Sequence, residues 1–233
     1  MPSLMPLVFI SGLLCNQTLW NGQVAGLSPF VDMVFADITK QESIAEMAAA
    51  VLKQAPAYFS LAGFSLGSQV ALEIMSTCPE RVERLALLSA THGGVLPPVA
   101  NSIQQAIETI EQGGFHSYLE AIYPTYVSAP HAVDPGLKRC FIEMAQAVGE
   151  EAGLRQMRAL LAIKCPFSNL DQIRCPTIII GGRDDHRTTP AAHEMLAQEI
   201  PGSELVLVEG AAHFTPLETP DIVTKAMRRW ATH

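Results

Sequence analysis

The stretch that decides the fold runs from Tyr58 to Gly67 and reads Tyr-Phe-Ser-Leu-Ala-Gly-Phe-Ser-Leu-Gly. Its first half, Tyr58–Ala62, is a short apolar run of the kind that is buried on both faces of a parallel sheet. The apolar stretch Leu66–Cys78 follows and has the length of a helix. Between the two lies the pattern G-x-S-x-G, which is typical of a sharp turn from strand to helix. The sequence therefore predicts a strand, a tight turn and a helix, with a serine in the turn.

The predicted turn makes Ser65 a candidate nucleophile. A sharp turn would push the Ser65 hydroxyl out above the edge of the sheet, and its strained backbone needs the small neighbours that Gly63 and Gly67 supply. The positive end of the following helix points its N–H groups at the same place, so the Leu66 N–H is a candidate oxyanion donor. The alternative interpretation is a glycine-lined turn that holds an ordinary serine.

Apolar runs like Tyr58–Ala62 recur along the chain, with helix-like stretches between them. This alternation predicts βαβ units with right-handed crossovers, and hence an α/β fold with a six-stranded, mostly parallel, doubly wound sheet. Glycines at Gly181-Gly182 and Gly210 are expected to mark strand ends. The expected strands are Leu7–Ser11, Met33–Ala36, Tyr58–Ala62, Leu85–Ser89, Thr177–Ile180 and Leu205–Val208.

One interval breaks the alternation, because no strand candidate appears from about Gly93 to Arg174. It reads as helices that proline and glycine separate, and we interpret it as a helical insertion between strands. We expect a single domain over residues 1–233, with a core of residues 1–92 and 175–233 and a helical cap at approximately 93–174. The expected helices of the cap are Ala100–Gln112, Phe115–Ile122, Leu137–Ala147 and Glu151–Ala162.

Composition excludes several classes of protein. The 233 residues are 48% hydrophobic and only 16% charged, which excludes a disordered chain. A net charge of −8 argues against nucleic-acid binding, which needs a basic surface. The sequence has no apolar run of membrane-spanning length, and its first residues lack the basic region of a signal peptide. We expect neither a membrane nor a nucleic-acid partner, and the oligomeric state stays open.

The cysteines point to a reducing compartment. There are five, Cys15, Cys78, Cys140, Cys165 and Cys175, an odd number at wide spacing. No pair has the short spacing of a metal site or of a redox motif. We therefore expect reduced thiols, a cytoplasmic location and no metal ion.

A serine hydroxyl becomes a good nucleophile only when a base takes its proton. His213 follows the last expected strand, so its loop would open at the same carboxyl edge of the sheet as the Ser65 turn. His92 follows the strand Leu85–Ser89 and is the second candidate. We expect His213 to be the base.

The third member of such a site is a carboxylate that orients the imidazole. In chain order it stands between the serine and the histidine. The loop after the strand Thr177–Ile180 carries Asp184 and Asp185, and both are candidates on this argument.

Four stretches in this order together resemble the α/β-hydrolase superfamily over nearly the whole chain. The resemblance is to small bacterial serine hydrolases of the carboxylesterase and enol-lactonase type. The stretches are Val8–Asn16 with Trp20, Gly63–Gly67, Cys175–Asp185, and Glu209–Phe214 with Leu217, Glu218 and Pro220.

The resemblance implies roles for particular residues. Ser65, Asp185 and His213 would form a catalytic triad, and the backbone N–H groups of Leu13 and Leu66 would form the oxyanion hole. The family's spacing favours Asp185 as the acid, because Gly182, Asp185, Thr188 and Ile200-Pro201-Gly202 fit it without a gap. Asp184 fits only if Gly181 takes the place of that glycine, and it stays the alternative acid.

The chain departs from the family pattern in two places. Ser11-Gly12 stands where the family usually has His-Gly, which affects the geometry of the oxyanion loop. The first two strands of the eight-stranded family fold are absent, so we expect six strands in the order 2-1-3-4-5-6. The helical interval then corresponds to the family's cap.

The resemblance implies a serine hydrolase that cleaves a small or medium ester through an acyl-enzyme, without a cofactor. A C–C hydrolase, thioesterase or lactonase on the same triad is the alternative, as is a ligand-binding protein of this fold that does not hydrolyse. Aromatic residues of the cap are expected to line a substrate pocket or, for most of them, to form the core of the cap. They are Phe115, Tyr118, Tyr123, Tyr126 and Phe141.

Overall fold

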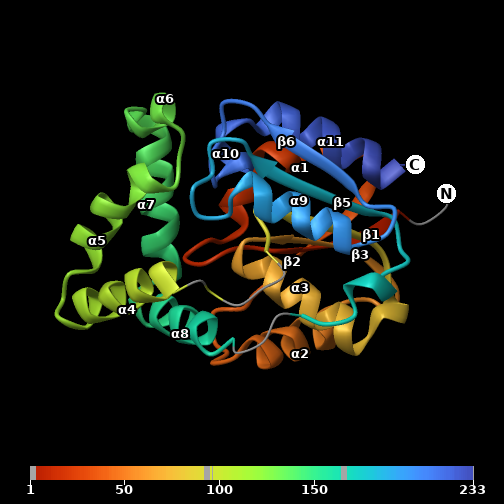
Figure 1. The fold of residues 1–233 in the computed structure, drawn as a ribbon, viewed down its shortest axis with the longest axis horizontal. Helices are drawn as coiled ribbons and strands as arrows, with labels where there is room; N and C mark the ends of the chain where they lie inside the picture. Colours follow the sequence, from red (N-terminus) through yellow and green to blue (C-terminus); the bar gives the residue numbers. More distant parts are fainter. Residues whose placement is uncertain (1–3, 92–94, 96, 164–166, 233) are drawn as a thin grey trace.

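The computed structural model describes residues 4–91, 95, 97–163 and 167–232. Its strands form one parallel sheet in the order β2-β1-β3-β4-β5-β6 (Figure 1). The predicted fold class and strand order are both confirmed. The strands are β1 (Met5–Ile10), β2 (Val31–Ala36), β3 (Phe59–Phe64), β4 (Val82–Leu88), β5 (Thr177–Gly182) and β6 (Glu204–Val208).

Helices cover both faces of the sheet, and each face has its own hydrophobic cluster. Successive side chains of a strand point to opposite faces, so Leu7 and Phe9 of β1 join one cluster while Val8 and Ile10 join the other. One face packs against α1 (Asn21–Leu27) and α11 (Pro220–Thr232). The other packs against α2 (Ile44–Gln54), α3 (Leu66–Thr77) and α9 (Pro190–Glu199).

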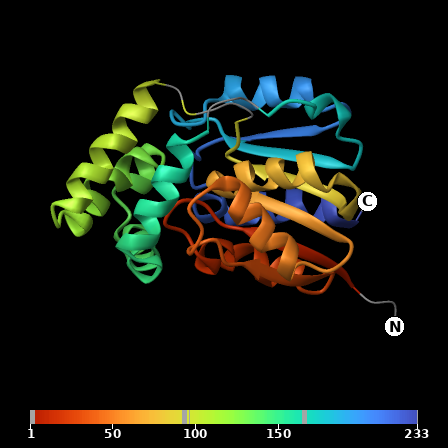
Figure 2. The same cartoon turned by 90° about the horizontal axis from the view of Figure 1, so that it is seen from below.

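Between β4 and β5 the described residues form helices joined by short turns and contain no strand, and these helices lie beside one end of the sheet, away from both chain termini (Figures 1 and 2). We call residues 97–161 the helical insertion. The expected helices are all present, with ends shifted by a few residues. The insertion comprises α4 (Pro97–Glu111), α5 (Phe115–Ile122), η3 (Tyr123–Thr125), α6 (Ala129–Ala132), α7 (Pro135–Val148) and α8 (Glu150–Leu161).

The helices of the insertion form because their sequences carry both a buried stripe and a start signal. In α4 the apolar residues Ile103, Ile107 and Ile110 recur at helical spacing and are buried. Asp134 caps α7, since its carboxylate accepts hydrogen bonds from the N–H groups of Gly136 and Leu137.

The expected glycines mark the end of β5, which runs two residues beyond the predicted Ile180 and ends at Gly182. They are needed because another segment comes close: a Cβ atom on Gly182 would lie 2.0 Å from the carbonyl oxygen of Ala212. Glycine in a strand often marks such a close approach. Here it lets the loop that carries His213 lie against the end of β5.

No helix within the described residues is long and apolar enough to cross a membrane. Four shorter elements complete the described part of the chain. These elements are η1 (Gln17–Trp20), η2 (Pro79–Arg81), η4 (Leu170–Gln172) and α10 (Thr215–Glu218).

Candidate active site

Ser65 occupies a strained turn between β3 and α3. Its backbone has φ 51° and ψ −112°, a conformation that non-glycine residues rarely adopt, and its N–H donates to the carbonyl of Leu88 at 2.9 Å. A Cβ atom on Gly63 would lie 2.4 Å from the Gly67 carbonyl oxygen, and one on Gly67 would lie 2.1 Å from that of Ile10. Only glycine fits at both positions, so the G-x-S-x-G pattern follows from close packing of backbone on backbone.

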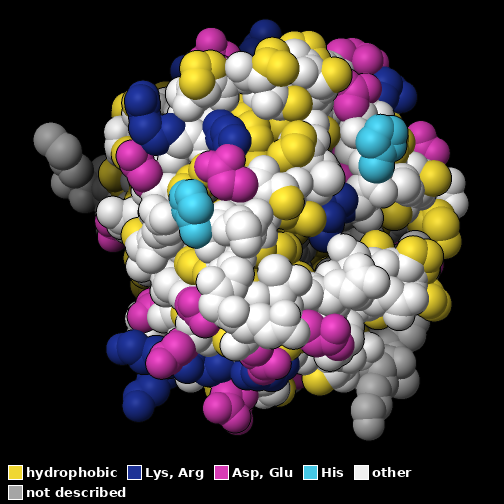
Figure 3. All heavy atoms as spheres, turned by 90° about the vertical axis from the view of Figure 1, so that its left-hand side faces the viewer, with side chains coloured by type: hydrophobic (Ala, Val, Ile, Leu, Met, Phe, Trp, Pro, Cys, Tyr) yellow, Lys and Arg dark blue, Asp and Glu magenta, His cyan; other side chains and the backbone are white. Residues whose placement is uncertain are grey.

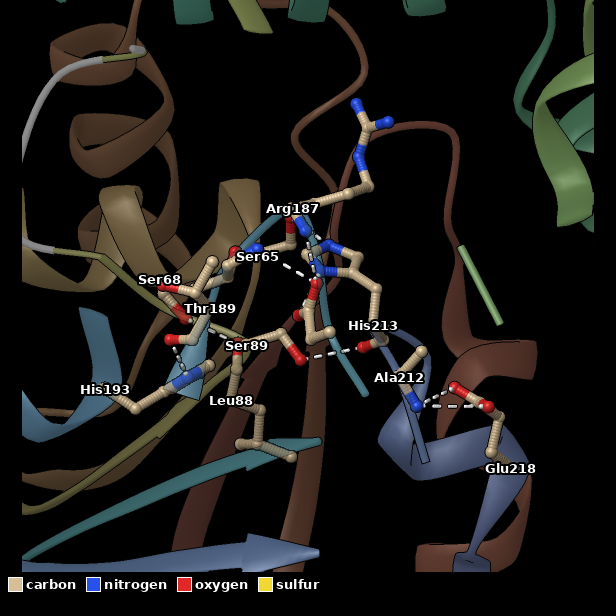
Figure 4. Close-up of polar contacts among 12 residues, drawn as sticks. Ser65, Ser68, Leu88, Ser89, Arg187, Thr189, His193, Ala212, His213 and Glu218 are labelled. Atoms are coloured by element: carbon tan, nitrogen blue, oxygen red, sulfur yellow. Dashed lines mark hydrogen bonds and ion pairs between the residues drawn. The ribbon is translucent and has the colours of Figure 1, made fainter. Parts of the chain in front are cut away.

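The structure brings Ser65, His213 and Asp185 together at the carboxyl edge of the sheet (Figure 4). Nε2 of His213 lies 3.0 Å from the Ser65 hydroxyl oxygen. Nδ1 of the same ring lies 2.8 Å from a carboxylate oxygen of Asp185. The imidazole therefore bridges the hydroxyl and the carboxylate, and it can accept a proton from one while donating to the other.

The Asp185 carboxylate is held ionised. Burial by itself would raise its pKa, but the adjacent His213 ring and the N–H groups of Thr188 and Arg187 outweigh burial and lower the pKa below its usual value. The two N–H groups donate to its second oxygen at 2.9 and 2.8 Å. Asp185 thus faces His213 as an anion in a fixed orientation.

The two candidate aspartates take different positions. Asp185 is 1% exposed and contacts His213, whereas Asp184 is exposed. At the end of β5 the backbone N–H of Asp184 donates to the Ala211 carbonyl, and the Asp184 side chain points outward. The neighbouring Arg183 pairs with Glu209 on the surface.

The backbone of His213 is fixed on both sides. Its N–H donates to the carbonyl of Tyr126 at 3.0 Å, and its carbonyl accepts from the Ser89 hydroxyl at 2.7 Å. The rings of Phe64 and Tyr126 lie 5.4 Å from the imidazole, centre to centre. Sequence reasoning missed these contacts, because Ser89 and Tyr126 belong to no motif and lie far from His213 in the chain.

Glu218 connects the His213 loop to the helical insertion. Its buried carboxylate accepts from the Ala212 N–H at 3.0 and 3.2 Å and from the Ser128 N–H at 2.7 Å. The ring nitrogen Nδ1 of His131 lies 3.2 Å away. Glu218 belongs to one of the four stretches that resemble the family, but the sequence alone indicated no role for it. The contact set shows that it anchors two loops at once.

Leu13 and Leu66 line the same cavity as Ser65. The backbone N–H of neither residue donates to an acceptor within the described residues. The loop that carries Leu13 is held one residue later, where Leu14 has φ 56° and donates its N–H to the Gln156 side chain at 2.9 Å. Gln156 belongs to α8, so the insertion fixes this loop.

Ser11, which stands where the family usually has histidine, stabilises the same loop. Its hydroxyl donates to the Asn16 carbonyl and accepts from the Trp20 indole N–H, both at 3.0 Å. Ser11 is nearly buried. A small hydroxyl therefore closes the loop that leads to Leu13.

A cavity of about 360 Å³ opens onto Ser65 and His213. Figure 3 shows that the insertion side of the molecule is hollowed near its centre, with hydrophobic side chains and a basic side chain at the edge of the hollow. Of the five aromatic candidates, Tyr118 and Tyr126 line the cavity, and the others pack into the hydrophobic cluster. His92, the second candidate base, lies outside the described residues.

Within the described ranges, no three His, Cys, Asp or Glu side chains are grouped so that they could hold a metal ion. The chemistry that the site offers is that of its own side chains: a hydroxyl next to an imidazole, which is next to an ionised carboxylate. This arrangement activates a serine as a nucleophile in hydrolases of several unrelated folds.

Comparison with known proteins agrees with the fold and defines the family. Residues 7–226 match the model of the alpha/beta hydrolase family, and the chain belongs to this family. The protein is thus an enzyme of the α/β-hydrolase class, as its sequence predicted.

Individual relatives are distant. The chain is 28% identical over 177 residues to the "Putative carbamate hydrolase RutD" of Klebsiella pneumoniae, a match that covers 74% of this chain but 65% of that relative. It is 23% identical to the pimeloyl-[acyl-carrier protein] methyl ester esterase of Nitrosomonas europaea, over 92% of this chain and 91% of that one. The enol-lactonase of Burkholderia xenovorans has a similar structure, with a TM-score of 0.88, 22% identity and coverage of 99% and 92%.

Proposed function

We propose that this protein is a serine hydrolase that cleaves small or medium carboxylic esters through an acyl-enzyme. The observation that carries the proposal is the unbroken hydrogen-bonded chain from Asp185 through His213 to Ser65. It lies at the wall of a cavity large enough for a substrate. The alpha/beta hydrolase family match supports the same reaction class.

In the first half of the reaction, the Ser65 hydroxyl attacks the ester carbonyl and gives its proton to Nε2 of His213. Asp185 accepts a hydrogen bond from Nδ1–H, fixes the tautomer of the ring and stabilises the imidazolium that forms. His213 then gives the proton to the leaving alcohol, and the acyl group stays on Ser65. Because the Asp185 carboxylate is ionised and buried, it can serve this role without taking the proton.

The Leu13 and Leu66 N–H groups hold the oxyanion in both halves of the reaction. Both residues line the cavity at Ser65 and their N–H groups have no acceptor within the described part of the chain, which supports a role as donors to a substrate oxygen. Loss of one such donor typically costs about 10²–10³-fold in rate. Water, activated by His213, then cleaves the acyl-enzyme.

We propose that residues 1–92 and 175–233 form the catalytic core and that residues 93–174 cap it. The insertion supplies Tyr118, Tyr126 and Leu160 to the cavity wall, and its helix α8 holds the oxyanion loop. The cavity of about 360 Å³ is near the lower end of the range for small-molecule sites, roughly 300–1,000 Å³. A small or medium substrate fits that size.

The same triad can serve related reactions. A lactonase, a thioesterase or a C–C hydrolase would use the same three side chains, and the relatives named above include a methyl ester esterase, an enol-lactonase and a candidate carbamate hydrolase. A panel of esters, thioesters, lactones and carbamates with graded acyl length would identify the bond that is cleaved.

The direct test is Ser65→Ala, with Ser117→Ala on the exposed surface of α5 as the matched control. We expect 4-nitrophenyl acetate hydrolysis to fall on the order of 10⁶-fold in Ser65→Ala, and not to change in Ser117→Ala. A fluorophosphonate probe should label the wild type and the control rapidly and fail to label Ser65→Ala. Unchanged hydrolysis in Ser65→Ala would overturn the mechanism. A wild type that neither hydrolyses nor labels would indicate a protein that only binds its ligand.

We also propose a cytoplasmic location. The four cysteines within the described residues, Cys15, Cys78, Cys140 and Cys175, are all free thiols. Structural disulfides are rare in reducing compartments.

A further inference from the structure

The charge of the cavity wall is opposite to that of the protein. The chain has 23 acidic and 15 basic residues. Yet none of the described residues that line the cavity is Asp or Glu, while Arg187 and His186 both line it. A basic side chain beside a reaction centre, in an otherwise acidic protein, suggests that the ligand brings a negative charge.

Arg187 has no anionic partner within the described part of the chain. No ion pair or side-chain hydrogen bond of Arg187 occurs there, although Arg183, Arg155, Arg158 and Arg229 each pair with a glutamate. The nearby phenol of Tyr118 does not neutralise it, because burial raises the pKa of Tyr118 far above neutrality despite the Arg187 charge. The five N–H donors of the guanidinium are therefore available to a ligand.

The position of Arg187 is tied to the triad. Its backbone N–H donates to Asp185 at 2.8 Å, while its side chain extends away from Ser65 and His213 (Figure 4). The guanidinium carbon lies 4.2 Å from the centre of the Tyr126 ring, and this same ring lies 5.4 Å from the His213 imidazole. Stacking on Tyr126 holds the cation in place without using its hydrogen bonds.

We propose that Arg187 binds a carboxylate of the substrate, so that the enzyme prefers esters that carry a free carboxylate at a distance from the scissile bond. The inference rests on the proposed esterase function and names its substrate class. One guanidinium matches one negative charge, which favours a carboxylate over a phosphate dianion, and its planar fork binds a carboxylate through two hydrogen bonds. The apolar wall formed by Val99, Ile103 and Ile163 would contact the part of the substrate between the two groups.

Two matched pairs of esters test the inference. Mono-4-nitrophenyl adipate, with its carboxylate on the acyl side, is compared with the neutral methyl 4-nitrophenyl adipate. 4-Acetoxybenzoate, with its carboxylate on the alcohol side, is compared with its neutral methyl ester. The measured quantity is the ratio of kcat/KM for the anionic ester to that for the neutral ester.

Three variants are compared with the wild type. Arg187→Met keeps an unbranched, flexible side chain and removes the charge, Arg187→Lys keeps the charge without the fork, and Arg183→Met removes a charge from the same loop on the surface. We expect the ratio in at least one pair to fall about tenfold or more in Arg187→Met, mainly through KM. It should fall less in Arg187→Lys and stay unchanged in Arg183→Met. In the wild type, added salt should lower the same ratio.

The outcomes separate this inference from the proposed function. If wild type cleaves the esters, Ser65→Ala does not, and Arg187→Met leaves both ratios unchanged, the substrate class is wrong and the esterase function stands. If wild type cleaves no ester faster than Ser65→Ala, the esterase function is wrong. Binding of monomethyl adipate to Ser65→Ala, measured by calorimetry, then tests Arg187 without turnover. An equal Kd in the Ser65→Ala, Arg187→Met double variant would overturn the carboxylate site.

Discussion

Asp184 and Asp185 are adjacent at the end of β5, but only one of them contacts His213. Asp185 is buried against His213, and Asp184 faces solvent. The difference comes from the turn at the end of β5, where the Asp185 N–H donates to the Gly182 carbonyl. The turn folds Asp185 back toward the sheet.

We therefore expect Asp185→Asn and Asp184→Asn to differ sharply. Asp185→Asn leaves the shape of the side chain intact but removes the charge that orients the imidazole, and kcat should fall on the order of 10⁴-fold. Asp184→Asn should retain activity within about twofold, as is usual for a surface change away from the site. Hydrolysis of 4-nitrophenyl acetate by both variants measures this. A larger loss in Asp184→Asn than in Asp185→Asn would reverse the assignment.

A second buried histidine gives stability a pH dependence that is separate from catalysis. His193 of α9 is 0% exposed, and its ring packs on Gly181, where a Cβ atom would lie 2.5 Å from the ring. Its Nδ1 lies 3.0 Å from the Thr189 carbonyl, to which it donates, and its Nε2 has no partner among the described residues. Burial lowers the pKa of His193, although the Asp185 charge acts in the opposite direction.

The sign of the effect follows from proton linkage. The pKa of His193 is about 6.5 in the unfolded chain and lower in the folded state. Just below pH 6.5 the unfolded chain therefore binds more protons than the folded protein. The stability that neutral His193 contributes should be fully retained above pH 6.5. The free energy of unfolding should fall as the pH drops below this value. One proton gives a slope of at most about 1.4 kcal/mol per pH unit.

His193→Gln should make this slope shallower between pH 6.5 and pH 5, since a neutral side chain replaces the histidine. Urea unfolding across this range measures the free energy at each pH. His116→Gln, at an exposed position of α5, is the matched control and should leave the slope unchanged. If the two variants give the same slope, His193 is not the group responsible.

Among the elements, helix α8 holds the loop that carries Leu13, the proposed oxyanion donor. The Gln156 side chain is fully buried, and its Oε1 accepts the Leu14 N–H. Close packing supports the contact, since a Cβ atom on Gly153 of α8 would lie 2.6 Å from a Leu14 methyl group. A helix of the insertion thus fixes the residue next to Leu13 and would, on the proposed mechanism, contribute to the geometry of the oxyanion hole.

Gln156→Leu should separate activity from stability. The substitution removes the acceptor of the Leu14 N–H, and a shift of the loop by about 1 Å can cost roughly a hundredfold in rate. We expect kcat to fall roughly ten- to a hundredfold, while KM changes less. Gln146→Leu, on the exposed side of α7, is the control and should leave kcat unchanged. A wild-type kcat in Gln156→Leu would show that the loop holds its shape without this contact.

The positions of the strands and helices were largely predictable from the sequence. Strands and helices were predictable because hydrophobic spacing is local, and the six strands and the main helices lie close to their expected ranges. The glycines at the end of β5 were predicted, but not the reason for them: a side chain at Gly181 or Gly182 would collide with His193 or Ala212, which approach from other elements. No local pattern distinguishes a glycine that ends a strand from one that makes room.

At the scale of the whole molecule, Glu218 joins the insertion to the sheet. Its carboxylate accepts hydrogen bonds from the Ala212 N–H, next to His213, and from the Ser128 N–H of the insertion. Glu218 is only 6% exposed. Removing a buried acceptor leaves its donors without partners, and each orphaned group costs about 1–3 kcal/mol. The stability of the two parts is therefore coupled through this side chain.

Glu218→Ala should lower the free energy of unfolding by roughly 2–5 kcal/mol. Glu209→Ala, which removes an exposed glutamate paired with Arg183, should change it by less than about 1 kcal/mol. Denaturant unfolding measures both variants. Equal and small effects would show that other contacts join the insertion to the sheet.

The sequence by itself determined the α/β fold and the serine turn, because hydrophobic periodicity and glycine spacing act over neighbouring residues, and through its resemblance to the α/β-hydrolase superfamily it predicted the order of the strands. It also supplied Ser65 and His213 as candidates, since parallel strands bring their carboxyl ends to one edge. The family's spacing favoured Asp185, but only the tertiary structure shows that its carboxylate meets His213 and which side chains hold the site, because these contacts join distant segments. Ser65 and His213 are 148 positions apart, and Glu218 and Ser128 are 90 apart. Contacts over such distances depend on tertiary packing, which also brings Arg187, a side chain with no ion pair among the described residues, to the cavity and the Tyr126 ring.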